Sequence, residues 1–190
     1  MMDIARSIYR FLWGHSTFLA LYRYDRVQQG AGYIDPVIQC YDGRDPMPDL
    51  VTKVLIKQSG NLSYRLLRRR TRQYGGFLLV LIQADVLIAY GWIQSWQPFK
   101  REYKWLGREW VCLGPYWTSP DYRGRGLYGR LLQHSIAECF ARGWFKAYIW
   151  ANINNTPSIR GIEKAEFVPV GSYKVSRYLS KLICSVHRIN

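Results

Sequence analysis

The sequence predicts an α/β fold in one domain that spans residues 1–190. Apolar runs of strand length alternate along the chain with longer amphipathic patterns of helical period. The 190 residues are 48% hydrophobic, which is enough for one sizeable core and argues against disorder. Neither an internal repeat nor a linker-like stretch divides the chain, so we expect no second domain.

The first third of the chain is expected to hold helices around one strand. Residues 3–12 read as helical, and residues 17–24 alternate in the manner of a strand. Residues 35–49 contain three prolines and read as a loop. Helical patterns follow at residues 48–57 and 61–73, and a pair of glycines ends the second pattern.

The middle of the chain predicts strands. Residues 77–83 and 86–95 are apolar runs that read as a strand pair joined by a tight turn. Residues 96–108 form a charged and aromatic excursion. The next strand is expected at residues 109–117.

A strongly amphipathic helix is expected at residues 127–142, with Gly143 as its stop. Its apolar positions recur at helical spacing: Tyr128, Leu132, Ile136, Cys139 and Phe140. His134 falls off this stripe. The chain then predicts a strand, a short helix and a final strand pair, at residues 144–151, 156–164, 167–173 and 175–185.

The chain is strongly basic. It has 27 basic and 13 acidic residues, a formal net charge of +14, which favours anionic partners. The charge concentrates in the helical pattern at 61–73, in Arg65, Arg68, Arg69, Arg70 and Arg72. This run is either a solvated helix face, a dock for a phosphate-bearing substrate, or a contact with an anionic membrane surface, where the basic, aromatic residues 1–18 could also lie. No specific nucleic-acid binding is expected, because no reading module is recognisable.

The four cysteines are scattered and have no paired spacing: Cys40, Cys112, Cys139 and Cys184. They read as small apolar core residues of a reducing compartment. The N-terminal apolar stretch is interrupted by Arg6 and Arg10, and no apolar run reaches the roughly 18 residues of a membrane span. We therefore expect a cytoplasmic protein, with peripheral membrane contact as an open alternative. No metal site is expected, because the histidines and cysteines lack ligand spacing.

Residues 121–132 form the most informative motif, in which a glycine-rich, arginine-flanked turn follows an apolar segment and leads into the long helix. Glycines at a strand-to-helix turn let backbone N–H groups converge on an anion, and the helix N-terminus adds partial positive charge. A P-loop is excluded, because Gly-Lys-Ser/Thr is absent. Gly124, Gly126 and Gly129 fit dinucleotide spacing, but the motif lies two-thirds along the chain and no acidic residue follows at the required distance.

Two blocks of the sequence resemble the GNAT family of N-acetyltransferases. Residues 123–128, Arg-Gly-Arg-Gly-Leu-Tyr, are similar to its acetyl-CoA loop, Arg/Gln-x-x-Gly-x-Gly/Ala, and residues 155–167 are similar to its later Asn-x-x-Ser block that ends in Lys-x-Gly-Phe. The resemblance covers about residues 110–173. It implies a mixed, mostly antiparallel twisted sheet of about seven strands, flanked by about four helices, in a single acyl-CoA-binding domain.

The resemblance also implies where acetyl-CoA, or another acyl-CoA, binds. The strand before the loop would splay from its neighbour and present backbone N–H groups of Tyr116, Trp117 and Thr118 to the pantetheine arm and the thioester oxygen. The pyrophosphate would be held by the glycine loop, Arg123, Gly124, Arg125, Gly126, Leu127, Tyr128 and Gly129. Asn155 and Ser158 are further cofactor candidates; Asn155 also suits a helix cap before Pro157.

The sequence departs from the family's pattern at the catalytic acid. The tyrosine expected seven residues after Asn155 is Ile162, which has no proton to donate, and Tyr128 stands where a small residue is usual. Either the thiolate leaves unassisted or another tyrosine serves, the candidates being Tyr116, Tyr128, Tyr148 and Tyr173. We therefore regard Tyr116 and Asn155 as candidate catalytic residues.

Glu109 is the leading candidate for a general base, because it precedes the strand that faces the acceptor side. Asp35, Asp42, Asp45 and Asp49 lie in the early loop and are alternatives, as is a chain of water molecules. Three acidic residues read as surface groups: Asp3, Asp85 and Glu102.

The resemblance implies acyl transfer from acetyl-CoA to an amine. Tryptophans around residues 92–110 favour a small acceptor, such as an amino sugar or a nucleotide-linked amine, although most of them must pack the core. Three alternatives stay open: a protein or peptide amine as acceptor, a non-catalytic CoA-binding sensor, and a basic surface protein whose glycine turn is only structural. A homodimer is also left open.

Overall fold

The structure is a computed structural model that describes residues 15–25, 35, 37–178 and 183–189. The helix expected at residues 3–12 lies outside the described residues. Within them, no helix is both long enough and apolar enough to cross a membrane.

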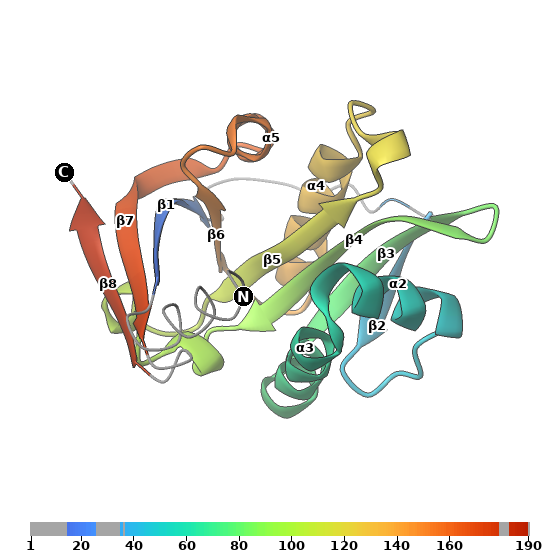
Figure 1. Ribbon diagram of the computed structural model, residues 1–190, viewed down its shortest axis with the longest axis horizontal. Helices are drawn as coiled ribbons and strands as arrows, with labels where there is room; N and C mark the ends of the chain where they lie inside the picture. The colour runs from blue at the N-terminus through green and yellow to red at the C-terminus, as the bar shows by residue number, and fades with distance from the viewer. Residues whose placement is uncertain (1–14, 26–34, 36, 179–182, 190) are drawn as a thin grey trace, which may run out of the picture.

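A single eight-stranded sheet forms the centre of the molecule (Figure 1). Its spatial order is β2-β3-β4-β5-β6-β1-β7-β8, and every neighbouring pair is antiparallel except the parallel pair β5–β6. The strands are β1 (His15–Asp25), β2 (Ile38–Asp42), β3 (Gly76–Gln83), β4 (Val86–Ser95), β5 (Val111–Thr118), β6 (Lys146–Asn152), β7 (Val168–Tyr178) and β8 (Ile183–Ile189). The expected mixed, mostly antiparallel sheet is confirmed, with eight strands in place of about seven.

Two strand assignments from the sequence are wrong. Residues 35–49 are not all loop, because β2 pairs with β3 along the sheet edge. The last strand pair divides later than expected: β7 continues to Tyr178, since its residues pair with β1 as far as Arg177. In both cases pairing with distant strands, not the local pattern, sets the boundary.

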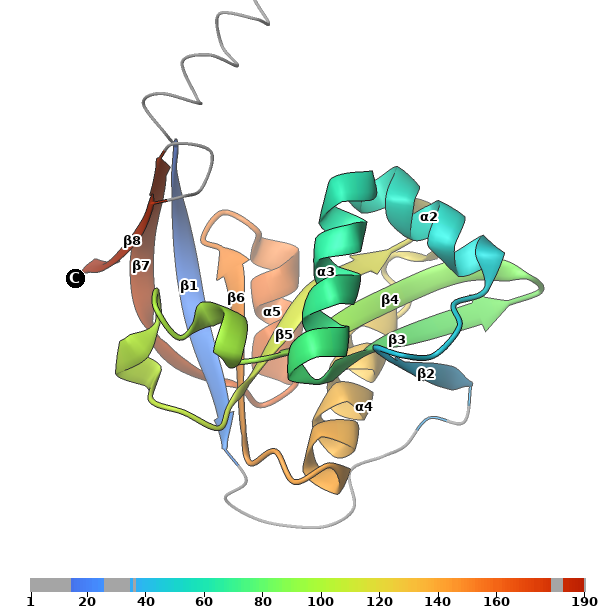
Figure 2. The same ribbon diagram turned by 90° about the horizontal axis from the view of Figure 1, so that it is seen from below.

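Four helices of the described chain cover the two faces of the sheet (Figures 1 and 2). They are α2 (Asp49–Ser59), α3 (Asn61–Tyr74), α4 (Leu127–Ala141) and α5 (Thr156–Lys164). Leu78 and Val80 of β3 pack in the core under α2 and α3, while Leu79 and Leu81 pack in the core under α4 and α5. Alternate residues of one strand thus fill both cores, which explains why β3 is apolar throughout.

The excursion at residues 96–108 contains two short 3-10 turns, η1 (Gln97–Phe99) and η2 (Lys104–Leu106). Tyr103 and Leu106 join a third apolar cluster with residues of β1, β5, β6 and β7. The excursion therefore covers the half of the sheet that α2 and α3 leave uncovered.

The sheet divides between β5 and β6. These strands pair at three positions only, ending at Leu113 opposite Ile149. Beyond this point β5 stays on β4, with a register irregularity opposite Gly91–Ile93, and β6 stays on β1. The splay implied by the family resemblance is present, and it places an opening at the centre of the molecule.

Candidate functional site

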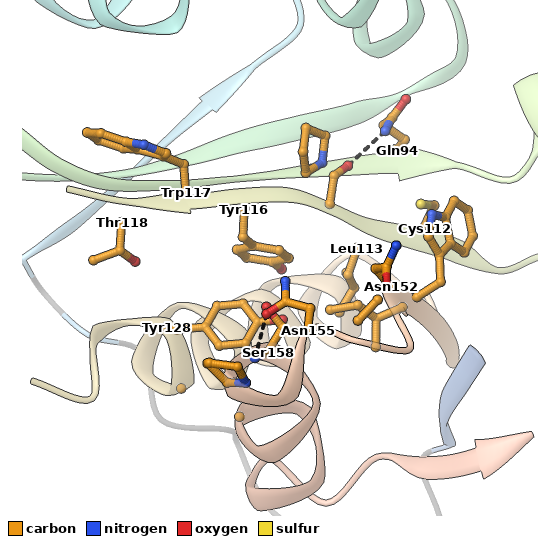
Figure 3. A pocket seen from close by; sticks show the side chains of 18 of the residues that line it. Gln94, Cys112, Leu113, Tyr116, Trp117, Thr118, Tyr128, Asn152, Asn155 and Ser158 are labelled. Carbon is orange, nitrogen blue, oxygen red and sulfur yellow. Dashed lines mark hydrogen bonds between the residues drawn. The ribbon is translucent and has the colours of Figure 1, made fainter. Parts of the chain in front are cut away.

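A cavity of about 1480 Å³ occupies the split between β5 and β6 (Figure 3). On one side it is lined by the glycine loop (residues 123–129) and by the first turns of α4 and α5. On the other side it is lined by α3, the end of β4 and the excursion. The cavity therefore lies in the split of the sheet and is lined from both of its faces.

Strand β5 presents backbone groups to this cavity. The N–H of Ser119 donates to the carbonyl oxygen of Ile88 on β4 at 2.8 Å. Because successive residues of a strand alternate direction, the N–H of Trp117 also points to β4, and those of Tyr116 and Thr118 point into the split. The Trp117 ring stacks on Tyr90 on the α2–α3 side. Two of the three residues expected to present donors thus have the required orientation.

The glycine loop leaves room for an anion. Gly124 and Gly126 have φ values of +76° and +74°, and a Cβ on either residue would meet no atom within 4 Å. Gly126 caps α4 without any side-chain hydrogen bond, so the first N–H groups of this helix face the cavity side unpaired by a cap. These residues fit a phosphate group, because open backbone donors and the helix dipole act together.

The two loop arginines are placed differently. Arg123 lines the cavity and its Nε donates to the carbonyl oxygen of Thr118 at 3.2 Å. Arg125 does not line the cavity; its guanidinium donates to the Asp121 carbonyl at 3.1 Å and lies over the Tyr122 ring. Of the twelve cofactor candidates from the sequence, Arg125 alone is turned away from the cavity.

The start of α5 brings Asn155 and Ser158 to the cavity wall (Figure 3). Asn155 is the N-cap, and its Oδ1 accepts a hydrogen bond from the Ser158 N–H at 3.3 Å. The cap predicted from the sequence is thus confirmed. The Nδ2 group is not used by this cap, so the same side chain retains donors for a ligand.

The expected position of the catalytic tyrosine is part of the core. Ile162 is fully buried. Tyr116 is no better placed as an acid: Ser135 Oγ donates to the Leu131 carbonyl, so the Tyr116 hydroxyl, 2.7 Å from Ser135 Oγ, is the donor to it. Burial raises the pKa of Tyr116 well above its ordinary value. The hydroxyl proton of Tyr116 is therefore used in the hydrogen bond to Ser135 on α4.

Tyr128 is the remaining tyrosine candidate that lines the cavity. Its ring packs edge-on against Tyr116 and fills the space beside Gly161, where a Cβ would lie 2.5 Å from Tyr128 Cδ1. Burial raises its pKa above the ordinary tyrosine value. Tyr148 and Tyr173 are buried in the cluster under the excursion and do not line the cavity.

The carboxylates favoured by the sequence lie outside the cavity. Glu109 is exposed, has a φ of +62° and does not line it. Asp42, Asp45 and Asp49 do not line it either. The structure therefore places none of these residues where a base for the reaction would have to be.

Asp35 belongs to a structural cluster behind the loop. It is 1% exposed and forms an ion pair with Arg130, and its backbone N–H donates to His134 Nδ1 at 2.9 Å. Burial alone would raise the pKa of Asp35, but the hydrogen bond and charge of Arg130 lower it overall. The expectation that His134 lies off the buried stripe is wrong, since it is 1% exposed and anchors residue 35.

The cavity is also lined by Gln94, which the sequence did not single out, and by Glu102, which the sequence placed at the surface. Gln94, 4% exposed, donates from Nε2 to the Gly114 carbonyl at 2.8 Å, and its Oε1 is buried without a hydrogen-bond partner. Glu102, expected at the surface, is half-buried and its Oε2 is also buried without a partner. The sequence feature that could have pointed to Gln94 is the presence of a glutamine within the mostly apolar run of residues 86–95.

The arginines of α3 divide into separate groups. Arg70 lines the cavity and lies over the Phe99 ring, 5.4 Å from its centroid. Arg68 donates to the backbone carbonyls of residues 42 and 45. The others, Arg65, Arg69 and Arg72, are exposed. Across the described chain, no three His, Cys, Asp or Glu side chains are grouped so that they could hold a metal ion.

Comparisons with known proteins identify the family of this chain. Residues 46–167 match the family model for the acetyltransferase (GNAT) family. Comparison with curated proteins gave no match. Among solved structures, the chain is similar to a GNAT-family acetyltransferase from Novosphingobium aromaticivorans, with 18% identity and a TM-score of 0.60 over 93% of this chain and 66% of that one. It is also similar to a GNAT-family acetyltransferase from Colwellia psychrerythraea, with 16% identity and a TM-score of 0.60 over 85% of this chain and 56% of that one.

A GCN5-related N-acetyltransferase from Sphaerobacter thermophilus is similar at 13% identity and a TM-score of 0.59, over 93% of this chain and 56% of that one. The chain thus spans between 56% and 66% of the length of these three structures. At such identities the likeness shows the fold, whereas the family model matches more than half of the sequence. With its split sheet and glycine loop, the chain belongs to the GNAT family of acetyltransferases.

Proposed function

We propose that this protein is an acyl-CoA-dependent N-acyltransferase that moves an acetyl group from acetyl-CoA to the primary amine of a small acceptor. The observation that carries the proposal is the cavity that lies in the split, with the glycine loop at one end and side chains of α3 and the excursion at the other. An amino sugar or a nucleotide-linked amine is the leading acceptor class. The scattered cysteines support a cytoplasmic location.

In this proposal each lining group has a defined task. The backbone N–H groups of the glycine loop and of the first turn of α4 hold the pyrophosphate. The N–H groups of Tyr116 and Thr118 donate hydrogen bonds to the pantetheine arm and to the thioester carbonyl oxygen, which polarises that carbonyl. The neutral amine attacks that carbonyl from the opposite side, and the thiol of CoA leaves. Tyr128 is the candidate for donating a proton to the departing sulfur, because this tyrosine lines the cavity.

Calorimetric titration with acetyl-CoA tests the proposal, using wild type, Gly126→Trp and a matched Gly143→Trp control. The φ values of Gly126 and Gly143 are +74° and +81°, and a Cβ on either residue would meet no atom within 4 Å. Both variants should therefore carry similar backbone strain. Only Gly126 lines the cavity. We expect micromolar binding by wild type and by the control, and its loss in Gly126→Trp. Absence of binding by wild type would overturn the proposal.

A non-catalytic CoA-binding module is a second candidate. Ile162 has no ionisable group and the Tyr116 proton is committed to Ser135, which favours binding without chemistry. Release of CoA thiol, measured with a panel of amines, separates the two functions. Binding with turnover supports the transferase, whereas binding without turnover supports the module. A protein or peptide amine as acceptor, a homodimer, and contact of the exposed α3 arginines with an anionic surface stay predictions.

A further inference from the structure

The two helical layers of the molecule differ in charge. Helices α2 and α3 contain seven basic residues and one acidic residue, whereas α4 and α5, on the other face of the sheet, contain three basic and two acidic residues. The excursion at residues 96–108 lies beside α3 and adds four basic residues and one acidic residue. The positive charge of the helices is therefore concentrated on the α2–α3 face.

Helix α3 carries five arginines and no acidic residue. Arg65 and Arg69 are four positions apart, and Arg69 and Arg72 are three apart, so like charges are neighbours on the helix surface. All three side chains are exposed, and none of them takes part in an ion pair among the described residues. The repulsion between them is thus uncompensated within the described fold, and an anionic partner relieves it.

Two leucines share the outer face of α3 with these arginines. Leu62 and Leu66 are one helical turn apart, and their exposed fractions are 84% and 46%. Of the large apolar side chains in the described chain, that of Leu62 is the most exposed. The opposite face of the helix buries Leu67 and Thr71. Packing of α3 on the sheet therefore leaves both outer leucines available to a partner.

We propose that the outer face of α3 docks the protein on an anionic lipid bilayer. Positions 62, 65, 66 and 69 have the spacing of one helix face, so the two leucines and two arginines project together. A helix that lies in a bilayer interface places its apolar side chains at the boundary of the acyl chains and its arginines among the headgroups. The exposed face of α3 offers both kinds of side chain.

The elements beside α3 widen this basic surface (Figure 2). The Thr52 hydroxyl of α2 lies 3.4 Å from the Tyr64 hydroxyl of α3, so these helices are neighbours. Exposed basic side chains are present on α2 and on the excursion: Lys53, Lys57, Lys100, Arg101 and Lys104. A bilayer is an extended anionic surface, so it can contact basic groups on all three elements at once.

The leucines distinguish a bilayer from a nucleic acid. Phosphates of a nucleic-acid backbone pair with arginine but give no favourable contact to an exposed leucine such as Leu62. A bilayer interface offers anionic headgroups to Arg65 and an apolar boundary to Leu62. The combination of residues on α3 therefore favours lipid.

The docking face adjoins the cavity. Leu66 and Arg70 of α3 line the cavity, and Leu66 also belongs to the exposed face. The glycine loop approaches the same cavity from the face that carries α4 and α5. A docked molecule thus holds the α3 side of the cavity against the lipid and keeps the glycine loop on the water side.

The test is co-sedimentation of the whole chain with vesicles of phosphatidylcholine and phosphatidylglycerol, with pure phosphatidylcholine vesicles as the neutral probe. Wild type is compared with Leu62→Ser and with the double variant Arg65→Glu/Arg69→Glu. Residues 1–14 are present in every protein compared, so the differences report on α3. We expect the double variant to lower affinity for the anionic vesicles by about 30-fold or more, and Leu62→Ser to lower it by about fivefold. Added salt should weaken binding of wild type.

Matched controls lie in the other half of the sheet. Val168→Ser changes a side chain of β7 that is 59% exposed, and Lys146→Glu/Lys174→Glu reverses two exposed charges on β6 and β7. Both controls should bind within about threefold of wild type, because they leave α3 intact. All variants alter exposed side chains, so their melting temperatures should stay close to that of wild type.

Three results contradict the inference. The first is equal binding of wild type to anionic and neutral vesicles, and the second is an equal loss in the α3 double variant and its charge control. The third is wild-type vesicle binding by Leu62→Ser; if duplex DNA of random sequence also binds both proteins equally, the surface is a nucleic-acid contact instead. Acetyl-CoA is absent from these assays, so their outcome does not depend on the proposed function.

Discussion

The two faces of the split sheet contribute to the cavity by different means. On the α4–α5 face, the wall is formed by the glycine loop, whose glycines leave backbone N–H groups accessible, and by the first turns of two helices. On the α3 face, the wall is made of side chains from α3, β4 and the excursion. The first face can change little without losing its donors, whereas the second can change one side chain at a time. In the proposed function, the molecule would thus separate a fixed cofactor surface from an adjustable acceptor surface.

The largest effect on the α4–α5 face is expected from Gly161→Leu. A Cβ at this position would lie 2.5 Å from the Tyr128 ring, so the interface of α4 and α5 must open. We expect a loss of about 3 kcal/mol in the free energy of unfolding, although leucine is the better helix former. Urea unfolding measures it. In combination with Tyr128→Ala the loss should shrink by at least about 1 kcal/mol, and strict additivity would show that the two side chains do not compete for space.

A smaller effect is expected from Asp35→Asn, which removes the charge that holds Arg130 at the cavity wall. Because Arg130 is 44% exposed, solvent screens the pair, and we expect a loss of about 1–2 kcal/mol at neutral pH. The pKa of Asp35 is lowered in the folded state, so its contribution is present above the ordinary aspartate pKa and is lost as the pH falls through the folded-state value. Urea unfolding of both proteins at pH 7 and at pH 3 should therefore give a difference that narrows in acid; a constant difference would rule out the ion pair as its source.

The smallest effect is expected from Glu109→Gln. This residue is exposed and lies outside the cavity, so its replacement should change the free energy of unfolding by less than about 0.5 kcal/mol. The kcat/KM for an amine should stay within about twofold of wild type. A large kinetic loss would instead identify Glu109 as the general base, as the sequence favoured.

The difference between the two faces also decides what could be predicted from the sequence. The glycine loop, α4 and the cap at Asn155 are local features, and their residues and spacing are contiguous in the chain. Gln94 and Glu102 line one cavity only because of the fold, and nothing adjacent to Glu102 in the sequence indicates that one of its oxygens is buried. His134 was misplaced for the same reason, since its burial depends on residue 35, which is 99 positions away.

Strand boundaries, too, were predicted where they depend on local sequence and missed where they depend on distant strands. The β3–β4 pair was predicted because both strands are apolar runs that flank a tight turn. Strand β2 has only five residues and lies at the sheet edge, where pairing with β3 outweighs the prolines around it. The end of β7 is set by its register with β1 and β8, which no local pattern contains.

The short contact between β5 and β6 has a mechanical consequence. Three residue pairs join the β2–β5 half of the sheet to the β6–β8 half, so this junction has the least backbone pairing to resist opening. A ligand that bridges the split would supply the cross-links that the strands themselves lack. Its binding free energy would then become resistance to unfolding, about 2.7 kcal/mol at a concentration 100 times Kd, and amide exchange in the diverging segments of β5 and β6 would slow most.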